Sequence, residues 1–231
     1  MSVSPGPAPA TQTAVLVSAG LDSVVLLAAE ARRARVHPIY VGAGFAWEDA
    51  EVAALARVLA LAPLAGRTAP LTRLAGPVHD LYPAGHWALA GRAPAFDTPD
   101  VEVYLPGRNV LLIARAAVHC AERGIGRLAL GPLAGNPFPD ATPAFFAAMA
   151  RAVSLGLAHE LAVVAPLAGM HKADVIRLGI ELTVPLAATL SCMSPRKGLH
   201  CGRCSKCRER RDAFADAAVT DPTEYASPPL R

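Results

Sequence analysis

The sequence predicts an α/β fold with a parallel sheet and a small cysteine-rich segment at its C-terminal end, on two observations. Short apolar segments rich in β-branched residues alternate with longer helical segments along residues 14–188, which is typical of a Rossmann-like parallel sheet covered on both faces. Four of the five cysteines then fall within residues 192–207. We therefore expect a leader over 1–13, an α/β domain over 14–188 and a zinc-binding segment over 189–231.

Composition narrows the class of protein before any motif is considered. With 231 residues, of which 53% are hydrophobic, the chain has enough apolar surface for a large core. No apolar run reaches the roughly 18 to 20 residues that a membrane helix needs, and no signal peptide is evident. Residues 1–13 are rich in Pro, Ser and Ala and predict a disordered leader. The net charge of +3 is too small to indicate nucleic-acid binding, so we expect a cytoplasmic protein.

The first strand, over 15–17, leads through a turn of small residues into a helix that extends to about residue 33. Ser18, Ala19 and Gly20 form the turn, and Asp22 and Ser23 suit a helix N-terminus. Free N–H groups and the positive end of the helix dipole both face such a turn, which predicts a phosphate or pyrophosphate site. Ala19 is tolerable there if its φ is negative. The alternative is an ordinary strand-to-helix turn.

The remaining elements follow in order. We expect a strand over 36–41, a helix over 48–61, a helix over 110–123, a strand over 127–131, a helix over 144–157, a strand over 161–165 and a helix over 172–178 that Gly179 ends. Residues 62–105 have poor periodicity and predict a long excursion at the sheet edge, where loops often line an active site. The glycines at 42 and 44 lack the third glycine of a dinucleotide-binding motif, which disfavours hydride chemistry.

Two cations stand at predicted helix starts. Arg108 precedes a helix that is apolar nearly all round and should therefore be buried, with Asn109 as its N-cap. A guanidinium there could bind a phosphate through two hydrogen bonds, although a surface arginine in a turn is the alternative. Lys172 opens another helix, where the dipole disfavours a cation. Its position indicates that a ligand phosphate needs the charge, with a solvated lysine as the alternative. Cys120 is expected in the core.

The cysteine cluster has the spacing C-x8-C-x2-C-x2-C, formed by Cys192, Cys201, Cys204 and Cys207. Four thiolates match the tetrahedral preference of Zn²⁺ and close its coordination shell, so the zinc should be structural. An iron–sulfur cluster is the alternative, and His200 is expected to be a spare. The Arg and Lys residues around the cluster either offset its negative charge, which we favour, or contact RNA.

Together these motifs resemble the 7-cyano-7-deazaguanine synthase family of PP-loop ATP pyrophosphatases. The resemblance runs from about residue 14 to 211 and rests on the order of the segments 18–23, 106–109, 138–140, 172–174, 189–192 and 201–207. It implies that ATP adenylates 7-carboxy-7-deazaguanine, that ammonia displaces AMP to give an amide, and that a second adenylation leads to the nitrile, a queuosine precursor. It also implies a homodimer, and neither a membrane nor a nucleic acid is expected as a partner.

The resemblance also implies roles for individual residues. The catalytic residues would be Asp22, Arg108 and Lys172, with Mg²⁺ bridging the phosphates. ATP would be held by the loop and by two strand edges, which comprise Val17, Ser18, Ala19, Gly20, Leu21, Asp22, Ser23, Val24, Val41 and Gly131. The acceptor would be bound by Asn109, Asn136, Phe138 and Asp140. Zinc would be held by Cys192, Cys201, Cys204 and Cys207.

The chain departs from the family in the regions expected to line the acceptor pocket. After the second strand the family has a Tyr-x-Gln-Arg-His stretch, whereas residues 41–46 here contain no Gln, Arg or His. Pro139 and Asp140 are followed by Ala and Thr, where the family carries Cys and Arg. Three alternatives stay open: a paralogue that adenylates another carboxylate, a tRNA-modifying PP-loop enzyme, and a non-catalytic zinc-bearing nucleotide-binding protein.

Overall fold

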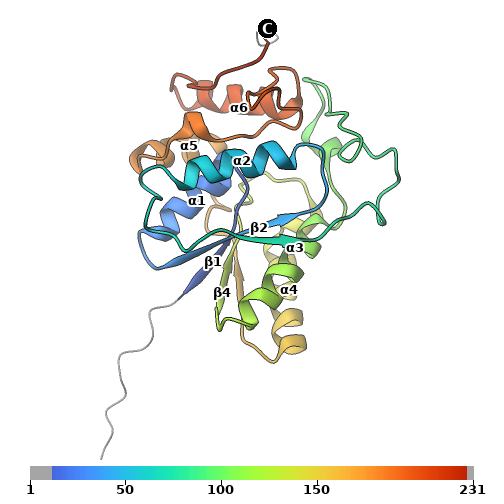
Figure 1. Cartoon of the computed structure of the whole chain (residues 1–231), viewed down its shortest axis with the longest axis vertical. Coiled ribbons are helices and arrows are strands. Elements are labelled where there is room, and N and C mark those ends of the chain that lie inside the picture. Colours follow the sequence, from blue (N-terminus) through green and yellow to red (C-terminus); the bar gives the residue numbers. More distant parts are fainter. Residues whose placement is uncertain (1–11, 228–231) are drawn as a thin grey trace, which may run out of the picture.

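A five-stranded, entirely parallel sheet forms the centre of the computed structural model, which describes residues 12–227 (Figure 1). The strands are β1 (Thr13–Leu16), β2 (Val36–Gly42), β3 (Thr72–Ala75), β4 (Arg127–Ala129) and β5 (Ala162–Val164), in the spatial order β3-β2-β1-β4-β5. The predicted α/β class is therefore confirmed. The predicted leader lies outside the described residues up to residue 11, and Thr13 already belongs to β1.

Helices cover both faces of the sheet, because side chains along a strand point alternately to opposite faces. One core contains Val15 and Val17 and packs against α1 (Leu21–Ala31), α2 (Glu48–Leu59) and α5 (Lys172–Glu181). The other contains Ala14 and Leu16 and packs against α3 (Arg108–Ala121) and α4 (Pro143–Leu157). The result is a three-layer α/β/α arrangement, with the two helix layers on opposite sides of the strands in Figure 1.

β1 is the central strand, and the strand order reverses at it: β2 and β3 lie on one side of β1, and β4 and β5 lie on the other. It pairs with β2 on one side, where Val15 is opposite Pro38, and with β4 on the other, where Val15 is opposite Ala129. Open parallel sheets bind ligands beyond the carboxyl ends of their strands at such a switch point. The small-residue turn after β1 lies at this edge.

The excursion over 62–105 contains a strand that was not predicted, because the periodicity of this segment is poor. Residues Thr72–Ala75 form β3 at the sheet edge, paired with β2. A short 3-10 helix, η1 (Asp100–Val103), precedes α3. Between them the chain is held against the C-terminal segment, because Ser205 N donates to the Pro94 carbonyl at 3.3 Å and Arg208 Nη2 to the Thr98 carbonyl at 3.2 Å.

Two expectations about α3 are wrong. The helix starts at Arg108, and its N-cap is Gly107 with a φ of 73°, so Asn109 lies inside the first turn and is not the cap. Glycine reaches this left-handed conformation without steric cost, which lets the turn at Pro106 enter the helix early. The helix is amphipathic and not buried all round, since Val110 and Val118 are exposed. Cys120 is fully buried in the core, as expected.

α5 continues past Gly179, contrary to the prediction that this glycine ends the helix. A Cβ atom at Gly179 would lie 3.0 Å from both Val25 Cγ2 and Leu186 Cδ2. The glycine therefore serves close packing of α5 against α1 and the 3-10 helix η3 (Leu186–Ala188), and the signal was interpreted as a stop.

The C-terminal segment ends in α6 (Ser205–Asp216), which packs beside α5 (Figure 1). Its Ala213 and Phe214 join the same core as Val15 and Leu27. Between residues 12 and 227, none of the helices combines the length and the apolar character that crossing a bilayer requires.

Candidate active site

The turn between β1 and α1 is held in shape by its own serines. Ser18 N donates to Ser23 Oγ at 3.1 Å, Gly20 N donates to Ser18 Oγ at 3.0 Å, and Ser23 Oγ lies 3.0 Å from the carbonyls of Ser18 and Gly20. Two N–H groups expected to be free for an anion are therefore already paired within the loop. The first turn of α1 also has N–H groups without a partner within the helix, and the phosphate site at this turn stays a prediction. The φ of Ala19 is not positive. This meets the condition under which an alanine is tolerated at this position of the turn.

This turn forms part of the wall of a cavity of about 870 Å³ at the carboxyl edge of the sheet. The first turns of α1, α3 and α5 all open onto it, through Asp22, Arg108 and Lys172. Most of the predicted site residues line it, namely Val17, Ser18, Gly20, Leu21, Asp22, Ser23, Val41, Arg108, Asn109, Gly131, Asn136, Phe138, Asp140 and Lys172. Ala19 and Val24 do not, because both are fully buried in the core.

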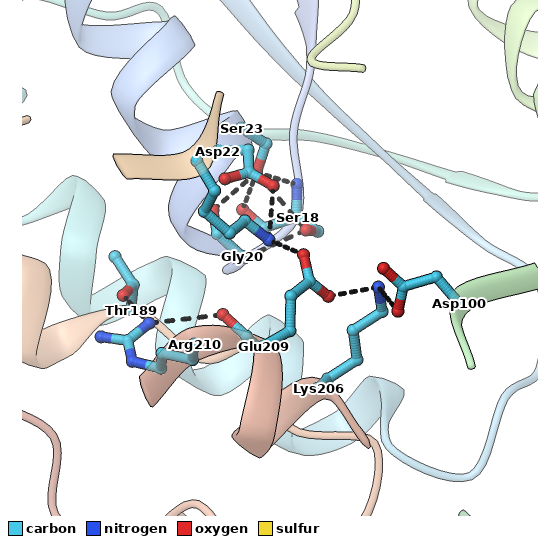
Figure 2. A network of polar contacts seen from close by, with 11 residues as sticks. Ser18, Gly20, Asp22, Ser23, Asp100, Thr189, Lys206, Glu209 and Arg210 are labelled. Carbon is cyan, nitrogen blue, oxygen red and sulfur yellow. Dashed lines mark hydrogen bonds and ion pairs between the residues drawn. The ribbon is translucent and has the colours of Figure 1, made fainter. Parts of the chain in front are cut away.

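Figure 2 shows Asp22, Glu209, Lys206 and Asp100, which belong to a chain of alternating charges in the cavity. Lys172 joins Asp22 to Glu209 in this chain. Its Nζ lies 3.1 Å from Asp22 Oδ2 and also pairs with Glu209 Oε1, while Glu209 Oε2 pairs with Lys206. Burial opposes the charge on Lys172, but Asp22 and Glu209 raise the pKa of its ammonium above the ordinary value. Burial likewise opposes the charge on Glu209, yet Lys172 and Lys206 lower the pKa of its carboxyl to about 2. These groups are therefore ionised at neutral pH.

Asp22 keeps one oxygen without a protein partner. Its Oδ2 is used by Lys172, whereas Oδ1 is buried and has no hydrogen-bond partner among residues 12–227. A buried carboxylate oxygen of this kind is costly unless a ligand completes it. Oxygen ligands are what Mg²⁺ prefers, so Asp22 fits a magnesium ion that accompanies phosphates.

A second acidic pair lies on the other side of the turn and was missed from the sequence. Tyr40 Oη donates to Glu51 Oε2 at 2.8 Å, and Glu48 accepts from the backbone N–H groups of Ala43 and Gly44. Burial raises the pKa of Glu51, although the nearby Arg108 opposes the rise. Glu51 could have been found, because it shares the helical stripe of the buried Ala54, Leu55 and Val58 in α2.

Stacked rings form the wall of the cavity where the family's Gln-Arg-His stretch is missing. Phe45 and Trp47 stack with their centroids 5.0 Å apart, and Trp47 stacks on Trp87 at 5.8 Å. All three line the cavity. We call these three residues the aromatic wall. The predicted role of the excursion in lining the site is confirmed by Trp87 and Asp100.

The four residues expected to bind the acceptor partly support one another. Asn109 N donates to Asp140 Oδ2, and Asn109 Nδ2 donates to the Asp140 carbonyl. Asn136 Oδ1 accepts from Phe138 N at 2.9 Å, and the Phe138 ring stacks on Tyr104 at 5.1 Å. The structure thus brings all four to one side of the cavity, but several of their polar atoms hold the loop and α3 together.

The four cysteines lie together in a buried cluster. Their Sγ atoms are all within 4.8 Å of one another, with separations of 3.9 Å for Cys192 and Cys204, 3.8 Å for Cys201 and Cys207, and 3.5 Å for Cys204 and Cys207. Four sulfurs at 2.3 Å around a tetrahedral zinc are about 3.8 Å apart. These separations fit a single zinc ion and exceed the roughly 2.05 Å of a disulfide. His200 is not among the four, as expected.

Backbone N–H groups donate to the cysteine sulfurs, whereas the buried Arg210 donates to other groups. The N–H groups found to donate to the sulfurs belong to the backbone of Ser194, Cys201 and Arg203. Arg210, which is 2% exposed, instead donates to the hydroxyls of Thr189, Ser191 and Thr223 and to the Leu186 carbonyl. These hydrogen bonds tie η3 and the C-terminal tail to α6, and the predicted offset of the cluster's negative charge by its cationic neighbours stays a prediction.

The C-terminal tail lies along the cluster. Ala226 N donates to the His200 carbonyl at 2.7 Å, and His200 N donates to the Glu224 carbonyl at 3.3 Å. Gly202 has a φ of 76°, and a Cβ there would lie 2.6 Å from the Ser227 carbonyl oxygen. The tail therefore covers the turn between Cys201 and Cys204.

Comparison with known proteins gives matches along almost the whole chain. A family described as "Queuosine biosynthesis protein QueC" matches residues 12–218. The 7-cyano-7-deazaguanine synthase of Anaeromyxobacter dehalogenans strain 2CP-C is 35% identical over 228 residues, covering 94% of this chain and 97% of that protein. The enzymes of the same name from Anaeromyxobacter sp. Fw109-5 and Methanothrix thermoacetophila are each 33% identical, covering 94% and 91% of this chain and 97% and 96% of those proteins.

Proposed function

The chain belongs to the queuosine biosynthesis protein QueC family, and on this basis we propose that it is the ATP-dependent enzyme that converts 7-carboxy-7-deazaguanine and ammonia into 7-cyano-7-deazaguanine. The family model matches both the sheet and the cysteine cluster, because the matched residues extend from 12 to 218. Beyond membership of the family, the proposal specifies the acceptor substrate, the class of reaction and the products.

One observation carries the nucleotide part of the proposal. Three helix N-termini converge on one cavity, and two of these helices begin with a cation, Arg108 in α3 and Lys172 in α5. Each cation is disfavoured by the dipole of its own helix. A bound polyphosphate offsets that cost and is at the same time favoured by the N-termini themselves.

The reaction we propose has two activation steps. The acceptor carboxylate attacks the α-phosphorus of ATP, which breaks the bond to pyrophosphate and forms an acyl adenylate. Ammonia then displaces AMP and leaves an amide. The amide oxygen attacks the α-phosphorus of a second ATP and releases a second pyrophosphate, and loss of AMP and a proton from that adduct gives the nitrile.

Within this scheme the side chains of the chain supply electrostatic stabilisation. Negative charge builds on the bridging oxygen as pyrophosphate leaves, so fixed cations that face it lower the barrier. Lys172 and Arg108 are placed for this role. Asp22 offers its unpaired Oδ1 to Mg²⁺, which would neutralise the phosphates. Four buried cysteines would hold zinc as a structural ion, since they leave no open coordination position.

The aromatic wall supports a second candidate, in which the same chemistry acts on another carboxylate. Phe45, Trp47 and Trp87 present stacked apolar surface where the family's Gln-Arg-His stretch is missing. A flat heterocycle suits such a surface through its ring face. Aromatic rings replace the hydrogen-bond donors that the Gln-Arg-His stretch of the family would supply. The acceptor substrate of this chain can therefore differ from that of the family in the polar groups at its edge.

We further propose a cytoplasmic homodimer. The five cysteines are free thiols in the structure, which agrees with a reducing compartment. The dimer is proposed from the family resemblance, and light scattering on the purified chain at micromolar concentration measures it directly.

The experiment that tests the function is a coupled product analysis. Purified protein is incubated with Mg-ATP, ammonium and 7-carboxy-7-deazaguanine, AMP and pyrophosphate are quantified, and the nucleobase is followed by mass spectrometry. We expect AMP, pyrophosphate and a nitrile product, each dependent on the acceptor. AMP formation with a different carboxylate, and none with 7-carboxy-7-deazaguanine, would establish the second candidate. No turnover with any carboxylate would refute both.

A further inference from the structure

Glu209 belongs to the cysteine-rich segment, yet its carboxylate points toward the turn with Ser18 and Asp22 (Figure 2). We call the part of the cavity beside this turn the phosphate end. Glu209 Oε1 contacts Lys172 Nζ and Glu209 Oε2 contacts Lys206 Nζ. Lys172 Nζ in turn lies 3.1 Å from Asp22 Oδ2, and Lys206 Nζ lies 3.9 Å from Asp100 Oδ1. The five side chains come from α1, α5, α6 and η1, so no single element holds them.

The charges in this network alternate along its length. Carboxylate, ammonium, carboxylate, ammonium and carboxylate follow one another from Asp22 to Asp100. The side chains of Lys172 and Glu209 are only 22% and 23% exposed. Interactions between such half-buried charges are screened less by solvent and salt than those at the surface. The loss of one member therefore removes an effective partner from each of its neighbours.

The two oxygens of Glu209 are divided between two cations, which fixes the orientation of the carboxylate. A lysine side chain has four flexible bonds and a compact ammonium, so its position depends on its partners. Asp22 holds Lys172 from the phosphate loop, and Glu209 holds it from the opposite side. Were Asp22 to bind a magnesium ion, Glu209 would still hold the ammonium.

We propose that Glu209 is a positioning residue, which keeps the Lys172 ammonium aimed at the phosphate end of the cavity while Lys206 balances its negative charge. The inference rests on the proposed ATP chemistry only for its effect on turnover. A carboxylate placed here without Lys206 would repel a polyphosphate, and the paired arrangement removes that penalty. Since Cys204 is the N-cap of α6, the helix that carries Glu209 starts at the cysteine cluster.

The chain has three lysines, Lys172, Lys197 and Lys206, which makes a direct measurement possible. Protein labelled with ¹³C and ¹⁵N in lysine gives one Cε–Nζ signal for each, and the exposed Lys197 serves as an internal reference. We expect Glu209→Gln to move the Lys172 signal, because the ammonium loses one of its two carboxylate partners, with Lys197 unchanged. The surface variant Glu181→Gln, whose side chain is 71% exposed, is the control and should move none of the three.

Turnover is measured on the same variants in a double-mutant cycle. Glu209→Gln should lower kcat about tenfold and change the KM for ATP less than about threefold, since positioning is needed most in the transition state. If Glu209 acts through Lys172, the double variant Glu209→Gln/Lys172→Met should be no slower than Lys172→Met alone.

The outcomes separate this inference from the proposed function. An unchanged Lys172 signal in Glu209→Gln, or additive losses in the cycle, would overturn the positioning role. Absence of ATP turnover in the wild-type protein would instead refute the proposed function, and the lysine signals would still decide whether Glu209 holds Lys172.

Discussion

Asn109 and Asp140 are joined by two hydrogen bonds, from Asn109 N to Asp140 Oδ2 at 3.0 Å and from Asn109 Nδ2 to the Asp140 carbonyl at 2.8 Å. Asp140 is 5% exposed and belongs to the short 3-10 helix η2 (Pro139–Ala141). Its carboxylate therefore satisfies a free N–H group in the first turn of α3, the turn that also carries Arg108. A loop that lines the cavity thus sets the start of the neighbouring helix α3.

Replacing Asp140 by Ala should lower the free energy of unfolding by about 1–3 kcal/mol, because a buried N–H group loses its acceptor. Urea denaturation measures the loss. Asp174→Ala is the matched control, since Asp174 also accepts a backbone N–H at a helix start but its side chain is 45% exposed. Equal losses in the two variants would contradict the structural role given to Asp140.

Asp22→Ala should abolish turnover, by at least about 100-fold, because it removes both the partner of Lys172 and the carboxylate oxygen that fits magnesium. The fold should persist, as judged by circular dichroism and thermal unfolding. Asp49→Ala, at an exposed position in the first turn of α2, should keep full activity. An active Asp22→Ala enzyme would mean that the phosphate loop has been assigned wrongly.

Glu51→Gln should make the protein more stable at pH 8 than the wild type. Burial raises the pKa of Glu51 above 4.5 in the folded state, so the unfolded chain releases this proton first as the pH rises. The contribution of the Glu51 carboxyl to the free energy of unfolding is therefore fully present below pH 4.5 and declines until the pH passes the pKa of the folded state. The total decline is about 1.4 kcal/mol for each unit by which folding raises the pKa of Glu51. Glutamine carries no such proton.

The measurement for Glu51 is the free energy of unfolding in urea at several pH values between 5 and 8. The difference between Glu51→Gln and wild type should grow with pH and then level off. The surface variant Glu181→Gln serves as the control and should follow the wild type. A difference that stays constant over this range would argue against a raised pKa for Glu51.

Cys204→Ser should lower zinc content and thermal stability together, since the affinity of a structural zinc site contributes to folding. Cys120→Ala is the matched comparison, because Cys120 is fully buried but far from the cluster in sequence. It should cost stability with no change in metal content. Stoichiometric zinc and an unchanged melting temperature in Cys204→Ser would refute the assignment of the four cysteines.

Local patterns in the sequence were sufficient for the elements whose signals are local. The first strand follows from adjacent residues, although β1 spans Thr13–Leu16 where 15–17 was predicted. The small-residue turn, α1 and the Cys spacing follow from equally local signals. Lys172 was identified because a cation at a helix start conflicts with the dipole, and the structure supplies the partners that offset this conflict. In each case the physical cause lies within a few residues of the signal.

The errors arise where distant segments meet. Glu209 pairs with Lys172 across 37 positions, and no pattern within α6 indicates that contact. Gly179 has the composition signal of a helix end, but its cause is the approach of Val25 from another helix. Asn109 was assigned as a cap because caps are local, whereas its hydrogen bonds go to Asp140, 31 positions away. Tertiary contacts override local propensity in all three.

The tail along the cysteine cluster bears on how fast a bound ion can exchange. With all four thiols buried and residues 224–227 running beside Cys201 and Gly202, a competing chelator reaches the ion only after the tail lifts away. Exchange then proceeds through local opening, whose rate does not depend on how much chelator is present. Metal loss should therefore be first-order and saturate at low chelator concentration, and deleting the chain from Glu224 onward should convert it to a process that accelerates with each addition of chelator.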